Sequence, residues 1–115
     1  RTLYELNSLG GIVENNTVLL QDISKSYPNV KSYPSLEDAL KNDDFAGFTV
    51  ATPAETHFEL SKGIIEANKH VLVEKPFTLN VENAEKLVKL ADESNVNLMV
   101  GHVLLFHPAI KYKFV

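Results

Sequence analysis

Apolar runs that alternate with helical patterns constrain the fold of this chain more than any other feature. The short runs predict strands, and they stand at residues 10–14, 45–51, 70–73 and 98–100. The stretches with apolar residues at helical spacing include residues 17–26, 53–67 and 81–94. Strands that take turns with helices predict an α/β chain with a doubly wound parallel sheet.

Polar residues mark where the predicted helices begin and end. Asn80 is expected to cap the helix that follows it, and Asn68 and Asn95 suit the left-handed residue that ends a helix. After the strand at residues 45–51, Thr52 is expected to cap the next helix, with Pro53 at its first helical position.

Length and composition bound the class of protein. The chain has 115 residues, 44% of them hydrophobic, so it can bury one core and make one domain. Its formal net charge is −4 without a basic block, which argues against a nucleic-acid partner. The absence of cysteine excludes a disulfide framework and a cysteine nucleophile, and no cluster of residues has metal-ligand spacing. We therefore expect no metal site.

The sequence also carries no sign of a membrane or secretory protein. No apolar stretch approaches the roughly 18 residues that a membrane span needs. The N-terminus has no signal-peptide pattern, so the expected compartment is the cytoplasm.

The tripeptide Glu74-Lys75-Pro76 follows the strand at residues 70–73 directly. A carboxylate and an ammonium at the carboxyl end of such a strand lie where open α/β sheets bind ligands. Proline prevents the strand from continuing, and a lysine there can exchange a proton with a substrate hydroxyl. A surface salt bridge at the strand end is the alternative, and the spacing alone does not decide between the two.

The glycine-rich turn G-x-G-x-x-G of dinucleotide-binding folds is missing. The chain begins in what reads as the helix that follows this turn, and Gly10-Gly11 starts a strand instead of following one. In the strand order 3-2-1-4-5-6 the missing strand is central, so the strand at residues 10–14 should lack its inner neighbour. We expect the chain to be an N-terminally shortened piece of a larger protein.

Three ordered motifs carry a family resemblance. They are the sequences ATPAETH at residues 51–57, VLVEKP at residues 71–76 and VGH at residues 100–102. This pattern resembles the glucose–fructose oxidoreductase, inositol dehydrogenase and rhizopine catabolism (Gfo/Idh/MocA) family from about Gly10 to about Ile110. The resemblance implies a Rossmann domain over residues 1–101 and, over residues 102–115, the start of a crossover to an absent C-terminal substrate domain. The segment at residues 106–109 matches the beginning of that crossover.

The resemblance also implies roles for individual residues. Those implied to bind the cofactor are Glu14, Asn15, Ala51, Thr52, Pro53, His57, Glu74 and Lys75, and those implied to be catalytic are Lys75 and His102. Glu14 would accept hydrogen bonds from the adenosine ribose, and its charge would repel a 2′-phosphate, which favours NAD over NADP. The alternatives are an exposed acid for Glu14 and structural histidines for His57 and His102.

The function implied by the resemblance is NAD-dependent hydride transfer to or from a hydroxyl-bearing carbon. The expected substrate is a small sugar-like molecule, namely a sugar, a cyclitol or a nucleotide sugar, and the parent protein is expected to be a homo-oligomer. The alternative is a non-catalytic NAD-sensing module on the same fold. Without a phosphate-binding turn, we expect these 115 residues alone to be inactive.

Overall fold

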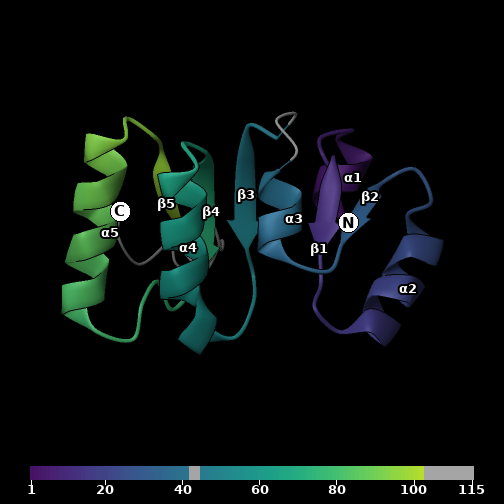
Figure 1. Cartoon of the computed structure of the whole chain (residues 1–115), viewed down its shortest axis with the longest axis horizontal. Helices are drawn as coiled ribbons and strands as arrows, with labels where there is room; N and C mark the ends of the chain where they lie inside the picture. The colour runs from purple at the N-terminus through teal and green to yellow at the C-terminus, as the bar shows by residue number, and fades with distance from the viewer. Residues whose placement is uncertain (42–44, 103–115) are drawn as a thin grey trace, which may run out of the picture. The chain divides into compact units, whose positions relative to one another are not determined.

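The chain folds into two compact units. The computed structural model describes residues 1–41 and 45–102 of the 115-residue sequence. One unit is Arg1–Phe45 and the other is Ala46–Val115, here the N-terminal and C-terminal units, and each is described by itself (Figure 1). In the described part of the chain, no helix combines the length and the apolar character that crossing a membrane requires.

The N-terminal unit contains a two-stranded parallel sheet. Its elements are α1 (Thr2–Glu5), β1 (Gly11–Val13), α2 (Thr17–Ser26), β2 (Lys31–Tyr33) and α3 (Leu36–Leu40). Strand β1 pairs with β2, and Ile12 lies opposite Ser32. The sequence analysis predicts no strand at β2, because its three residues form no apolar run. Pairing with β1, and not composition, makes this segment a strand.

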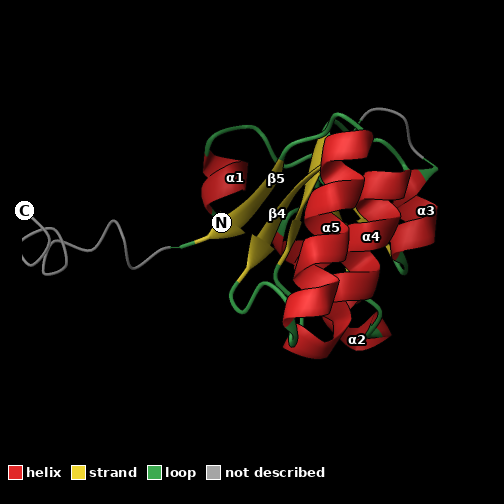
Figure 2. Ribbon diagram, turned by 90° about the vertical axis from the view of Figure 1, so that its left-hand side faces the viewer, coloured by secondary structure: helices red, strands yellow, loops and turns green. Residues whose placement is uncertain are grey.

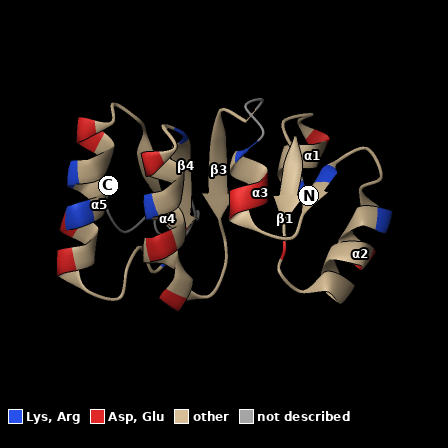
Figure 3. Cartoon of the chain, in the orientation of Figure 1, with Lys and Arg blue, Asp and Glu red and all other residues tan. Residues whose placement is uncertain are grey.

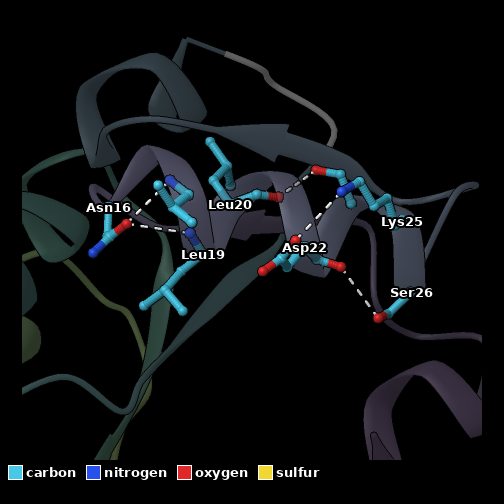
Figure 4. Close-up of polar contacts among 8 residues, drawn as sticks. Asn16, Leu19, Leu20, Asp22, Lys25 and Ser26 are labelled. Carbon is cyan, nitrogen blue, oxygen red and sulfur yellow. Dashed lines mark hydrogen bonds and ion pairs between the residues drawn. The ribbon is translucent and has the colours of Figure 1, made fainter.

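Helix α2 begins and ends where the sequence predicts. Asn16 caps it, since its side-chain oxygen Oδ1 accepts hydrogen bonds from the backbone amides of Val18 and Leu19 at 3.0 and 3.2 Å (Figure 4). Further along, the Ser26 hydroxyl donates to the Asp22 carbonyl (Figure 4). The cap satisfies two of the amides that every helix leaves without a partner at its start.

An aromatic ring explains the two adjacent glycines at the start of β1, Gly10 just before the strand and Gly11 as its first residue. A Cβ atom on Gly10 would lie 2.9 Å from the ring of Phe45, and one on Gly11 would lie 2.7 Å from it. The Phe45 ring packs edge-on against Tyr33, with ring centroids 5.8 Å apart. The prediction that a strand begins at Phe45 is wrong. The strand begins at Gly47, and the Phe45 ring packs within the N-terminal unit.

The C-terminal unit is a three-stranded parallel sheet covered on one face by two helices. Its elements are β3 (Gly47–Val50), the 3₁₀ turn η1 (Ala54–Thr56), α4 (His57–Glu66), β4 (His70–Glu74), α5 (Val81–Glu93) and β5 (Leu98–Gly101). The strand order is β3-β4-β5, with Val50 opposite Val73 and Val73 opposite Val100. Helices α4 and α5 lie side by side on the same face of this sheet (Figures 1 and 2).

The core of the C-terminal unit lies between that sheet and the two helices. Alternate residues of β4 are buried, and together with Val50 of β3 they meet the buried residues of α4 and α5. The buried hydrophobic side chains are Val50, Val71, Val73, Ile64, Ile65, Leu87 and Ala91. The outward faces of α4 and α5 carry charges of both signs (Figure 3), including the pair formed by Lys86 and Glu82 at 2.7 Å.

Most of the predicted helix ends in this unit are confirmed. Asn68 and Asn95 have φ angles of 58° and 53°, and Asn80 caps α5 by accepting from the Asn83 amide at 2.8 Å. The prediction that Thr52 caps the next helix is wrong. Pro53 is extended, with ψ at 142°, so the chain makes η1 first and α4 begins without a side-chain cap.

The predicted fold class is confirmed, because parallel strands alternate with helices throughout the described residues. Among the described strands, β1 has β2 as its one hydrogen-bonded neighbour, and β3 has β4.

We predict that Gly47→Ala destabilises the C-terminal unit. The new Cβ would lie 2.9 Å from the His70 carbonyl oxygen, which is backbone, so β3 and β4 must separate at this register pair. Overpacking of this kind destabilises the folded state by about 1–3 kcal/mol. Alanine also lowers the conformational entropy of the unfolded chain, which stabilises the folded state by only roughly 0.4–1 kcal/mol. Urea-induced unfolding measures the difference, and an unchanged free energy of unfolding would contradict the prediction.

Candidate active site

The carboxyl ends of three parallel strands meet at one edge of the C-terminal unit. Thr52 comes two residues after β3, Glu74 is the last residue of β4, and His102 directly follows β5. Glu74 lies opposite Gly101 in the strand register. The structure therefore brings the candidate residues of all three motifs to the same edge, which is where open parallel sheets bind ligands.

Lys75 projects from this edge without an internal partner. Its side chain is exposed, and within residues 1–41 and 45–102 its ammonium makes no ion pair or hydrogen bond. Glu74 is half-buried and forms no salt bridge with Lys75 in the same part of the chain. The alternative of a strand-end salt bridge is thus not formed among the described residues.

The carboxylate of Glu74 rests against a residue that has no side chain. A Cβ on Gly101 would lie 3.0–3.1 Å from the two carboxylate oxygens and the Cδ atom of Glu74. The sequence identifies Gly101 as the residue where a strand stops. Only the register, which sets Gly101 opposite Glu74, shows that the glycine makes room for the carboxylate.

A chain of hydroxyl groups orders the turn after β3. The Thr56 hydroxyl donates to the Pro53 carbonyl oxygen at 2.7 Å, so its single proton is used. The Thr52 hydroxyl lies 2.7 Å from the Thr56 hydroxyl and must be the donor of that pair. Ala51, Thr52 and Pro53 are all exposed at the strand end, in the position where a cofactor is expected.

His57 is buried under the edge, with 1% of its surface exposed. Its Nε2 atom lies 2.8 Å from the Thr52 carbonyl oxygen, and its Nδ1 atom lies 2.7 Å from the Pro76 carbonyl oxygen. Both ring nitrogens therefore face backbone carbonyls. The expected contact of His57 with a cofactor stays a prediction, and in the structure the two ring nitrogens meet the carbonyls of the turns after β3 and β4.

Glu14 and Asn15 belong to the N-terminal unit, where they follow β1. The Glu14 amide donates to the Tyr33 carbonyl oxygen at 3.1 Å, which extends the pairing of β1 with β2 by one bond. The Glu14 Oε1 atom accepts from the Asn16 amide at 2.8 Å, and Asn15 between them is exposed. A half-buried carboxylate therefore stands at the carboxyl end of β1, held by a local hydrogen bond.

His102 is exposed, and its amide donates to the Val100 carbonyl oxygen at 3.0 Å. The predicted crossover segment at residues 106–109 lies outside the described residues, as does the rest of residues 103–115.

Two further features concern the ionisable side chains. The Lys86 ammonium hydrogen-bonds and attracts Glu82, which lowers the pKa of that fully exposed carboxyl group in the first turn of α5. In the described part of the chain, no three histidine or acidic side chains are grouped so that they could hold a metal ion.

Sequence reasoning missed three participants, namely the Pro76 carbonyl, the Thr56 hydroxyl and the Asn16 amide. The carbonyl and the amide are backbone groups, which any residue carries, so no side-chain pattern could reveal them.

Comparisons with known proteins show the family to which the chain belongs. Residues 4–102 match the family GFO_IDH_MocA, described as an oxidoreductase family with an NAD-binding Rossmann fold. The chain is 32% identical over 107 residues to UDP-N-acetylglucosamine 3-dehydrogenase of Acidithiobacillus ferrooxidans, covering 93% of the chain and 33% of that protein. It is 33% identical over 82 residues to scyllo-inositol 2-dehydrogenase (NADP(+)) IolW of Bacillus subtilis, covering 71% of the chain and 23% of that protein.

A solved structure gives the same picture. The WlbA dehydrogenase of Bordetella pertussis, in complex with NADH and UDP-GlcNAcA, is similar with a TM-score of 0.84 and 25% sequence identity. That match covers 89% of this chain and 31% of the other. The chain thus spans about a third or less of the length of these relatives.

We predict that Gly101→Ala moves the Glu74 carboxylate while leaving the fold intact. The new Cβ meets the far end of a flexible side chain, not backbone, so the carboxylate gives way. The free energy of unfolding should change by less than about 1 kcal/mol. The carboxyl ¹³C resonance of Glu74 should shift. Gly47→Ala is the matched control, because the same added methyl group meets backbone there. An unmoved Glu74 resonance would count against the contact.

Proposed function

Because the chain belongs to the Gfo/Idh/MocA oxidoreductase family, we propose that it is the nicotinamide-binding part of an NAD-dependent dehydrogenase. The proposed reaction transfers a hydride between the nicotinamide and a hydroxyl-bearing carbon of a sugar, cyclitol or nucleotide sugar. Relatives that are named as a nucleotide-sugar dehydrogenase and an inositol dehydrogenase support this substrate class.

The observation that carries the proposal is the position of Lys75. The residue follows β4 at the edge where three strands end, its side chain is exposed, and its ammonium has no partner among the described residues. Because surface ion pairs contribute little to stability, the place of Lys75 at the strand ends supports the proposal more than its lack of a partner does. An unpaired cation at a strand end is suited to an oxygen-bearing substrate.

Lys75 would act on the substrate hydroxyl. A bound nicotinamide supplies the acceptor for the hydride. As the carbon–hydrogen bond breaks, negative charge develops on the substrate oxygen while that oxygen loses its proton. Lys75 stabilises this charge through its ammonium, or accepts the proton as an amine, and Glu74 and His102 line the same strand ends.

The residues present fit part of an NAD molecule. Glu14 accepts from the Asn16 amide through Oε1, while its Oε2 atom makes no hydrogen bond in the described part of the chain, so it can accept from a ribose hydroxyl. Its charge disfavours a 2′-phosphate, hence NAD over NADP, although relatives are named with either cofactor. These 115 residues contain no G-x-G-x-x-G turn, so this chain supplies no such cradle for the pyrophosphate.

We predict that Lys75→Met lowers kcat about 100- to 1,000-fold in the full-length protein that contains this chain. Methionine keeps the length of the side chain but removes the charge and the proton. NADH formation with a panel of sugars, cyclitols and nucleotide sugars measures the effect. Lys89→Met, which removes an exposed lysine of α5, is the matched control. An undiminished rate would remove Lys75 from the chemistry, and tight NAD binding without turnover by the unaltered protein would favour a cofactor-sensing module.

We predict that Glu14→Ala weakens NAD binding roughly 10- to 100-fold, because hydrogen bonds to a charged group are lost. Binding of NADP should change little or improve, since the repulsion of the 2′-phosphate disappears. Calorimetric titration of both cofactors measures the two affinities. Glu37→Ala, an exposed acid of α3, serves as the control. An equal loss of affinity for NAD and NADP would show that Glu14 does not recognise the ribose.

A further inference from the structure

One buried ring joins the segments that follow two neighbouring strands. His57 faces the Thr52 carbonyl oxygen through Nε2 at 2.8 Å and the Pro76 carbonyl oxygen through Nδ1 at 2.7 Å. Thr52 comes two residues after β3, and Pro76 comes two residues after β4. A single side chain therefore spans the two turns that carry the candidate cofactor and substrate residues.

The ring is itself held in place by the core. His57, Ser61, Ile64 and Ile65 form the buried face of α4, and the ring is 1% exposed. Carbonyl oxygens can only accept, so a ring nitrogen that bonds one of them must carry a proton. A neutral ring donates to one of the two carbonyls, and a doubly protonated ring donates to both. Each such hydrogen bond fixes one turn to the helix, and fixing both turns at once requires a proton on both nitrogens.

Lys75 lies between two anchored residues as a result. On one side Glu74 belongs to β4 and is in register with Gly101, and on the other side His57 holds the Pro76 carbonyl. The lysine side chain is exposed and has no partner among the described residues. The positions of Glu74 and Pro76, which flank it in the backbone, therefore determine which positions its ammonium can reach.

We propose that His57 is a positioning residue, which clasps the turns after β3 and β4 and thereby places Lys75 against the substrate. This inference rests on the proposed dehydrogenase function. A misplacement of about 1 Å can cost on the order of 100-fold in rate, so even a partly relaxed clasp should be visible in kcat.

The first experiment needs no variant and no activity. In protein labelled with ¹⁵N-histidine, at least one ring N–H of His57 should be observed and protected from solvent exchange. The ring of His70 is the internal comparison, since it is exposed and its Nδ1 atom accepts from the Asn97 amide. Rapid exchange of every His57 ring proton would overturn the clasp itself.

The second experiment asks whether the clasp acts through Lys75. His57→Phe, which keeps a ring but removes both nitrogens, is introduced into the full-length protein and into the Lys75→Met variant. We expect kcat to fall roughly 10- to 100-fold in the first background and less than about 3-fold in the second. His57→Gln, which retains one donor, should recover part of the rate, and His70→Gln should leave it unchanged.

The outcomes separate this inference from the proposed function. Equal losses of kcat in both backgrounds would mean that His57 only supports the fold, which overturns the positioning role. An unaltered rate in Lys75→Met alone would remove Lys75 from the chemistry and with it the catalytic consequence of the clasp, whereas the absence of NADH formation by the unaltered protein would overturn the proposed function. The exchange measurement on the His57 ring would still decide whether the clasp exists.

Discussion

The parallel register of β3, β4 and β5 is the constraint on which the candidate site depends. Because all three strands run in the same direction, the segments that follow them emerge at one edge, and residues distant in sequence become neighbours. Buried side chains such as Val73 and Ile64 hold that register by packing the sheet against α4 and α5. A slip of one residue would turn this buried face outward, so the core and the site are specified together.

Local contacts at the strand ends then position the side chains that the strand register brings together. Gly101 leaves space for the Glu74 carboxylate, and His57 ties the Pro76 carbonyl to the start of α4. The strand pairing of Glu74 and the contact of His57 with the Pro76 carbonyl restrict the backbone on each side of Lys75. When the backbone beside it is restricted, the long, exposed side chain of Lys75 has fewer accessible positions and is better oriented.

The two units differ in how much core they hold. Among the described residues, Ala39 is the one buried hydrophobic residue of the N-terminal unit, whereas residues 46–102 of the C-terminal unit include seven, among them Ile65 and Leu87. Stability from apolar burial therefore lies mainly in the C-terminal unit. The N-terminal unit should open at lower free energy, and the Glu14 carboxylate belongs to that unit.

The sequence by itself determined the alternation of strands and helices, the left-handed ends at Asn68 and Asn95, and the strand-end motif around Lys75, because periodicity and local turn chemistry are short-range properties. Strand β2 was decided only by tertiary structure, since its residues gain strand geometry from pairing with β1. The same holds for the role of His57. A histidine pattern cannot reveal which carbonyls its ring will meet, because that depends on how α4 packs on the sheet.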